Sequence, residues 1–192
     1  MNYNGFWFSA DKNICKLIKS YDVPTINGIW FVENHDTVTD LGRVENMFPS
    51  KVCDCLYVYN FTTFGTPLIY GGEEIADKNP HNMFANKEYN RGYGVDWSNA
   101  LLPNGKHRLK LIERLSNLRK TEDVLAYGTF SWLETQGDLL AFERNYNGET
   151  ISVFINFSKL EYNVEAKGEI LLSRGYKQTQ LKTSGFVIFK HN

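Results

Sequence analysis

The sequence lacks the features that define several protein classes. Its 192 residues include three cysteines, and its 21 basic and 22 acidic side chains leave a formal net charge of −1. This balance gives no electrostatic argument for nucleic acid or an anionic membrane as a partner. No apolar run approaches the roughly 20 residues that a membrane-spanning helix needs. We therefore expect no nucleic-acid partner and no membrane partner.

The cysteines and the first residues bear on location. Near Met1, no basic stretch is followed by the apolar core of a secretory signal peptide. An odd number of cysteines argues against a disulfide framework, and Cys53 and Cys55 face different directions on a predicted helix. A Cys-x-Cys pair without further Cys or His ligands falls short of the four that zinc needs. These features predict a cytoplasmic protein without a metal site.

The first region, residues 1–122, alternates strands and helices. An apolar run at 28–33 predicts one strand, and residues 65–74 predict a turn, a second short apolar strand and a Gly-Gly loop, about 40 residues further along the chain. Strand, helix and strand in this order predict the βα repeat of a parallel sheet or barrel. Further predictions are a helix at 11–21, a polar loop at 36–49, a helix at 50–63 capped by Ser50, a long loop at 75–104, and an amphipathic helix at 105–120 with Leu109, Ile112, Leu115 and Leu118 on one face.

The second region, residues 123–192, changes to short strands separated by turns. Asn147-Gly148 is a two-residue hairpin signal. The pattern predicts a small antiparallel sheet or sandwich, with a domain boundary near 123. The expected strands are Thr129–Leu133, Leu139–Tyr146, Thr150–Phe157, Tyr162–Val164, Ile170–Leu172 and Phe186–Phe189.

An Asn-His-Asp triplet, at residues 34–36, follows the first predicted strand. In barrels of parallel strands, chemistry lies at the carboxyl ends of the strands. The triplet is therefore a candidate for binding a polar substrate. A loop Asx turn with a surface histidine is the alternative.

Several segments in order resemble the α-amylase family, glycoside hydrolase family 13. Residues 31–36 resemble its motif at the end of barrel strand seven, and residues 65–74 resemble its strand-eight segment. Residues 111–120 are similar to its last barrel helix, and residues 128–157 look like the start of its C-terminal β-domain. The resemblance implies the C-terminal part of a TIM (β/α)8 barrel, strands seven and eight with their helices, followed by a small antiparallel β-sandwich domain.

The resemblance also implies a retaining glycosidase acting on an α-glucan or maltooligosaccharide. Asp36 would be the transition-state stabiliser, although a capping carboxylate is the alternative. His35 would donate to a sugar hydroxyl, and Asn34 would hold the loop in shape. The family often has an Arg where this sequence has Thr39, so Arg43 is a second candidate for substrate binding.

Five further residues receive expected roles. Tyr93 and Trp97 are candidates for stacking on sugars, with core packing as the alternative. Gly72 and Glu74 are expected to be structural near the site. Glu73 is likewise expected to be structural rather than catalytic.

Two catalytic carboxyl groups are expected to be missing. A barrel allots about 30 residues to each βα unit, so strand five lies about 60 residues before strand seven, and 27 residues precede Gly28. No Gly-x-Arg-x-Asp stretch, the family's usual surrounding for the nucleophile, occurs. We therefore expect a chain that is inactive alone and needs the missing N-terminal part of the barrel as a partner. A non-catalytic glycan-binding or interaction module is the alternative. No cofactor is readable from the sequence, and calcium is left open for a full-length enzyme.

Overall fold

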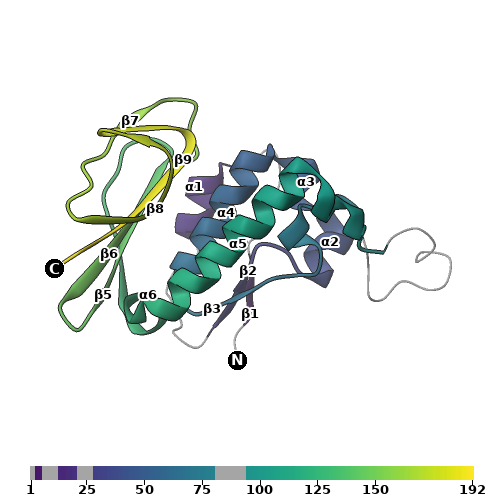
Figure 1. The fold of residues 1–192 in the computed structure, drawn as a ribbon, viewed down its shortest axis with the longest axis horizontal. Coiled ribbons are helices and arrows are strands. Elements are labelled where there is room, and N and C mark those ends of the chain that lie inside the picture. The colour runs from purple at the N-terminus through teal and green to yellow at the C-terminus, as the bar shows by residue number, and fades with distance from the viewer. Residues whose placement is uncertain (1–2, 6–12, 21–27, 81–93) are drawn as a thin grey trace.

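The computed structural model describes residues 3–5, 13–20, 28–80 and 94–192. Three short strands, β1 (Tyr3–Gly5), β2 (Ile29–Phe31) and β3 (Thr66–Leu68), form a parallel sheet in that order. Three helices, α1 (Ile14–Ser20), α4 (Ser50–Thr62) and α5 (Pro103–Thr121), accompany this sheet (Figure 1). The parallel βα order is confirmed, and β1 is an additional strand that the sequence reading missed.

The predicted polar loop at 36–49 is wrong, because it contains the helices α2 (His35–Leu41) and α3 (Val44–Met47). Asn34 caps α2 with a capping box: its side chain accepts from Thr37 N at 2.8 Å, and the Thr37 hydroxyl accepts from Asn34 N at 2.9 Å. Such a reciprocal pair satisfies two backbone donors that would otherwise lack partners. The cap therefore starts a helix that has few apolar residues.

The helices around this segment differ in detail from the predictions. Pro49, not Ser50, is the N-cap of α4, and no side chain caps it. On α5, Leu109 is 39% exposed, whereas Leu111, Ile112 and Leu115 are buried, so the predicted apolar face was turned too far toward Leu109. The predicted loop at 75–104 includes part of one 3₁₀ helix, η1 (Glu73–Ile75), and all of a second, η2 (Trp97–Leu101).

After the short helix α6 (Asp123–Tyr127), the chain forms a six-stranded antiparallel sheet. At the β5–β6 turn, Asn147 and Gly148 have φ values of 50° and 83°, as a two-residue hairpin turn requires. All six predicted strands are present, and the last two are longer than predicted. The strands are β4 (Thr129–Trp132), β5 (Leu139–Tyr146), β6 (Glu149–Asn156), β7 (Tyr162–Asn163), β8 (Glu169–Lys177) and β9 (Gln180–His191).

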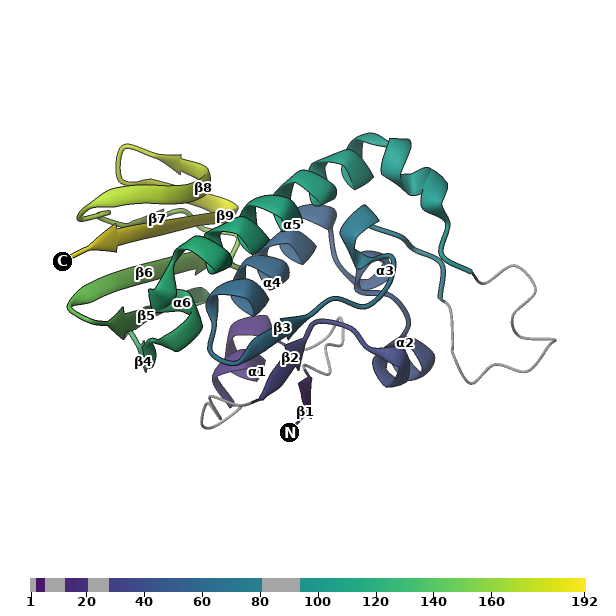
Figure 2. The same cartoon turned by 60° about the horizontal axis from the view of Figure 1, so that its bottom comes forward.

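One hydrophobic core joins the two regions. Helix α4 contacts α5 on one side and strands β6 and β9 on another, so it lies between the parallel strands and the antiparallel sheet (Figure 2). Ring pairs continue from β2 to β5, with centroids of Trp30 and Phe64 4.9 Å apart, Phe64 and Phe130 4.9 Å apart, and Phe130 and Phe142 5.0 Å apart. A second, smaller core contains Leu139, Val164, Leu181, Val187 and Phe189. The boundary near 123 stays a prediction, but the packing is continuous across it.

Within the described ranges, no helix is both long and apolar enough to cross a membrane.

Candidate functional site

The triplet lies where β2 ends and α2 begins. Asn34 is the cap, so His35 and Asp36 fall in the first turn of α2. Their side chains are 35% and 54% exposed, and His35 Nε2 lies 3.3 Å from Asp36 Oδ1. Asp36 is therefore not the helix-capping carboxylate that the alternative required. It presents an accessible acceptor at the carboxyl end of a parallel strand.

Behind the triplet, Glu33 and Arg43 form a buried ion pair. The side chains are 1% and 0% exposed, with Arg43 Nε 3.0 Å from Glu33 Oε2. Arg43 Nη1 also donates to the Gly71 carbonyl at 3.0 Å, and Val44 N donates to Glu33 Oε1. Arg43 thus links the end of β2 to the turn after β3. Since its side chain has no exposed surface, the structure places this predicted substrate-binding residue inside the protein.

Glu73 adds a second buried carboxyl group beside Glu33. Its Oε2 accepts from Tyr70 N at 2.7 Å. Burial raises the pKa of Glu73 well above its usual value, and the nearby Glu33 carboxylate raises it further. Burial also raises the pKa of Glu33 to about 7, against the opposing effect of Arg43. Burial therefore favours the protonated form of both residues, and the neighbouring carboxyl group adds to this effect at Glu73.

The turn that precedes Glu73 depends on Gly72. Its φ is 96°, and a Cβ there would lie 3.0 Å from Asp77 Cβ and 3.1 Å from Arg43 Nη2. Gly72 N donates to Glu74 Oε2 at 2.9 Å. This geometry supports structural roles for Gly72 and Glu74, because a side chain at 72 would be strained and crowded.

Of the two aromatic candidates for sugar stacking, Trp97 lies within the described residues. Trp97 is the first residue of η2 and is 60% exposed, so core packing does not explain it. Asp96 caps η2 by accepting from Ser98 N at 3.0 Å. Tyr93 lies outside the described residues. Stacking of Trp97 on a sugar stays a prediction.

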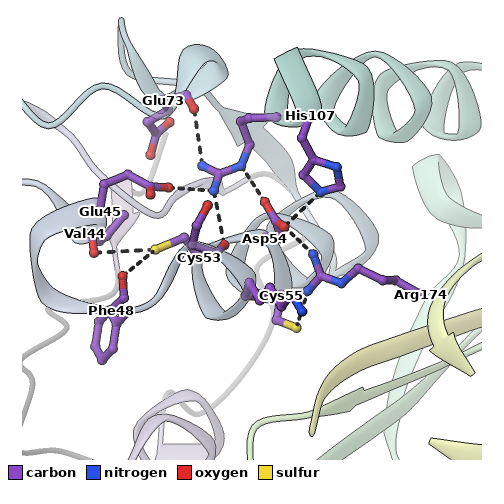
Figure 3. A network of polar contacts seen from close by, with 12 residues as sticks. Val44, Glu45, Phe48, Cys53, Asp54, Cys55, Glu73, His107 and Arg174 are labelled. Atoms are coloured by element: carbon purple, nitrogen blue, oxygen red, sulfur yellow. Dashed lines mark hydrogen bonds and ion pairs between the residues drawn. The ribbon is translucent and has the colours of Figure 1, made fainter. Parts of the chain in front are cut away.

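A second polar network joins residues of α3, α4, α5 and β8 (Figure 3). Arg108 is fully buried, with Nη2 2.6 Å from Glu45 Oε1 and Nε 2.7 Å from Asp54 Oδ1. Arg108 Nη1 donates to the Glu73 carbonyl at 3.4 Å. The other Asp54 oxygen binds Arg174 of β8 and lies 3.1 Å from His107 Nε2. The network ties α3, α4, α5, η1 and the antiparallel sheet to one another.

The burial of the arginines was not predicted from the sequence. One signal was available for Glu33, because it is a carboxyl group at the end of an otherwise apolar run. No local signal marked Arg108, whose partners Asp54 and Glu45 lie more than 50 residues away.

Metal ligation finds no support in the parts of the chain that the structure describes, where no group of three or more His, Cys, Asp and Glu side chains could hold an ion. All three cysteines are free and buried.

Parallel strands with flanking helices, followed by an antiparallel sheet, form the arrangement expected for the C-terminal part of a barrel with a sheet domain after it. Comparison with known proteins shows what the chain is similar to. The chain is 27% identical over 172 residues to a cyclomaltodextrinase of Thermoanaerobacter pseudethanolicus, covering 86% of this chain and 27% of that protein. It is 26% identical over 160 residues to a cyclomaltodextrin glucanotransferase of Geobacillus stearothermophilus, covering 82% and 20%.

Solved structures agree on the fold. A putative α-amylase from Salmonella typhimurium superposes with a TM-score of 0.73 at 19% identity, over 88% of this chain and 36% of that one. No protein-family model matches the chain. These similarities confirm the resemblance to the α-amylase family and the barrel-plus-sheet fold class. The chain spans 27% and 20% of the lengths of the two curated relatives.

Proposed function

We propose that the chain is the C-terminal portion of a retaining α-glucan-acting glycoside hydrolase, in which Asp36 stabilises the transition state. The accessible Asp36 carboxylate at the carboxyl end of β2 carries this proposal. The names of the curated relatives, a cyclomaltodextrinase and a cyclomaltodextrin glucanotransferase, support an α-glucan or maltooligosaccharide as substrate.

The chemistry assigns Asp36 a supporting role. A retaining glycosidase uses a nucleophile and an acid/base about 5–5.5 Å apart and passes through an oxocarbenium-like transition state. A third carboxylate accepts hydrogen bonds from ring hydroxyls, and bonds to a charged acceptor are roughly twice as strong as neutral ones. It also stabilises the positive charge that develops on the sugar ring. His35, 3.3 Å from Asp36, would donate to a neighbouring hydroxyl.

The remaining chemistry requires further barrel strands. In the described sheet, β1 and β3 each pair with β2 alone. Each therefore has a free edge that another parallel strand could extend. We infer that the N-terminal part of a barrel pairs with these edges and brings the nucleophile and the acid/base.

Complementation tests this proposal. The chain would be co-expressed with the part of the cyclomaltodextrinase relative that precedes the matched region, and hydrolysis of maltoheptaose would be measured. We expect no hydrolysis by the chain alone and hydrolysis by the complex. In the complex, Asp36→Asn should lower kcat by about 100-fold or more.

Asp40→Asn is the matched control, because Asp40 is an exposed carboxylate on the same helix. It should keep the activity of the complex. Hydrolysis by the chain alone, or equal rates for the two variants, would contradict the proposal. A complex that forms and binds maltoheptaose without hydrolysing it would favour the non-catalytic module.

A further inference from the structure

Two adjoining grooves lie where α1 meets the connection between β4 and β5. The first, of about 420 Å³, is lined by Lys19, Trp132, Leu133, Glu134 and Thr135. The second, of about 580 Å³, is lined in part by Asn13, Lys16, Ser20 and Asp138, and Lys19 lines both. Their volumes are in the range of small-molecule sites, about 300–1,000 Å³. None of these residues belongs to the strand-end site.

Trp132 gives the first groove a fixed aromatic surface. Its side chain is 37% exposed on β4, which is an edge strand of the antiparallel sheet among the described residues. The ring lies nearly parallel to Tyr59, at 8° and 6.4 Å, and nearly perpendicular to Phe130, at 89° and 4.8 Å. Phe142 contacts it at 84° and 5.9 Å. Because three rings hold the indole in place, a ligand that stacks on it would immobilise few additional torsions.

Hydrogen bonds fix the walls of the grooves. Lys19 Nζ donates to Thr135 Oγ1 at 3.3 Å, and Thr135 Oγ1 donates to the Leu139 carbonyl at 2.5 Å. Asn13 Nδ2 donates to Asp138 Oδ1 at 2.5 Å. Helix α1 is thereby joined to the β4–β5 connection at two points. The grooves are formed before any ligand binds.

The lining selects a neutral, polyhydroxylated ligand. Lys19 offers donors, Glu134 offers acceptors, and the Thr135 hydroxyl offers both. The second groove repeats this mixture with Lys16 and Asp138. Because each groove is lined by both a positive and a negative side chain, a strongly anionic or cationic ligand is disfavoured. A pyranose ring fits this lining, because it places C–H groups on its faces and hydroxyls around its rim.

We propose that these grooves form a second glucan-binding site, with one sugar ring stacked on Trp132 and the chain continuing past Lys19. The choice of an α-1,4-glucan among sugars rests on the proposed function. The stacked ring would hold the polymer against the antiparallel sheet, and the strand-end site would be separate from it.

Binding to the chain as it exists tests the proposal. Isothermal titration with maltoheptaose, with cellohexaose as the control sugar, would give the affinity. Trp132→Ala should weaken maltoheptaose binding at least about tenfold, and Tyr127→Ala, which removes another exposed aromatic ring, should leave it unchanged. Since Trp132 also packs against three rings, circular dichroism would check that the variant folds.

A second measurement needs no destabilising variant. In ¹H–¹⁵N spectra of the wild-type chain, the indole N–H of Trp132, assigned with Trp132→Phe, should shift on titration with maltoheptaose. Three outcomes would overturn the proposal: no binding at millimolar sugar, binding that Trp132→Ala leaves unchanged, or equal binding of cellohexaose.

The two proposals fail separately. Binding at Trp132 together with an inactive complementation complex would refute the proposed function and leave the sugar site standing, with its natural glycan reassigned. An active complex whose chain shows no shift at Trp132 would refute the sugar site alone.

Discussion

Asp54 of α4 and Arg174 of β8 form an ion pair between residues 120 positions apart in the sequence. The Asp54 side chain is 2% exposed and also accepts from Arg108 Nε at 2.7 Å. Arg174 continues the link, because its Nη2 donates to the carbonyls of Lys51 at 2.6 Å and Ser184 at 2.7 Å. One carboxylate thus joins a barrel helix, its neighbour and the antiparallel sheet.

Asp54→Asn should destabilise the chain strongly. The change leaves Arg108 fully buried with only one carboxylate partner, Glu45. Removing one member of a buried ion pair costs about 3–5 kcal/mol, because the remaining charge stays out of water. The free energy of unfolding from urea titrations should fall by this amount. Arg174→Met should cost less, since Arg174 is 21% exposed.

The double variant separates the ion pair from local effects. If the two residues interact, the combined loss should be smaller than the sum of the single losses. Additive losses would show that the contact contributes nothing. Asp40→Asn on α2 is an exposed aspartate control and should change the free energy of unfolding by less than about 0.5 kcal/mol.

Residues on both sides of the boundary near 123 should unfold together. Buried side chains of α4 and α5, such as Leu56 and Leu115, share one core with Leu140, Ile155 and Ile188 of the sheet. Neither part can lose its packing without exposing the other. Urea curves from helix circular dichroism and tryptophan fluorescence should superimpose. Two separated transitions would instead establish independent domains.

Most of the fold could be predicted from the sequence, because most helices and strands are indicated by patterns of neighbouring residues. Apolar runs located β2 and β3, and the alternation of strands and turns located all six antiparallel strands. By contrast, β1 holds its place through pairing of Tyr3 with Ile29, which no short window reveals. Helix α2 was missed because its start depends on a cap at Asn34 rather than on apolar periodicity.

The position of the candidate site could be predicted from the sequence, but the burial of its residues could not. The strand-end location of Asn34, His35 and Asp36 followed from one apolar run and its end. The burial of Arg43 did not, since arginine is rarely buried unless paired. Its partners Glu33 and Gly71 come together only when β2 and β3 lie side by side.

Glu33 should make stability fall as the pH rises. Burial raises the pKa of Glu33 to about 7 in the folded chain, from about 4.5 when exposed. Between these pH values the folded state retains a proton that the unfolded state has released. The free energy of unfolding therefore decreases with pH across this window, by up to about 1.4 kcal/mol per pH unit.

Glu33→Gln removes this titration and keeps an acceptor for Val44 N. Its free energy of unfolding should depend less steeply on pH than that of the wild type between about pH 4.5 and 7. Urea titrations at several pH values would measure the slopes, with exposed Glu113→Gln as the control. An unchanged slope in Glu33→Gln would mean that Glu33 does not retain its proton.

Arg144 should stabilise the end of α4 through the carbonyls it binds. From β5, its guanidinium donates to Thr62 O at 3.1 Å and Thr63 O at 2.6 Å, where the helix leaves carbonyls unpaired. It also donates to Gly128 O at 2.8 Å and to Thr129 O at 3.1 Å. Burial lowers the pKa of Arg144 to about 10, so it stays charged at neutral pH.

Arg144→Met should therefore lower the free energy of unfolding by about 2–4 kcal/mol, because several buried carbonyls lose their donor. Arg144→Lys should recover only part of this loss, since one ammonium cannot reach both the helix end and the Gly128–Thr129 segment with a planar fork of donors. Exposed Arg114→Met on α5 is the control, expected within about 0.5 kcal/mol of the wild type. Full stability of Arg144→Lys would show that a point charge at the end of α4 suffices and that the fork geometry is not required.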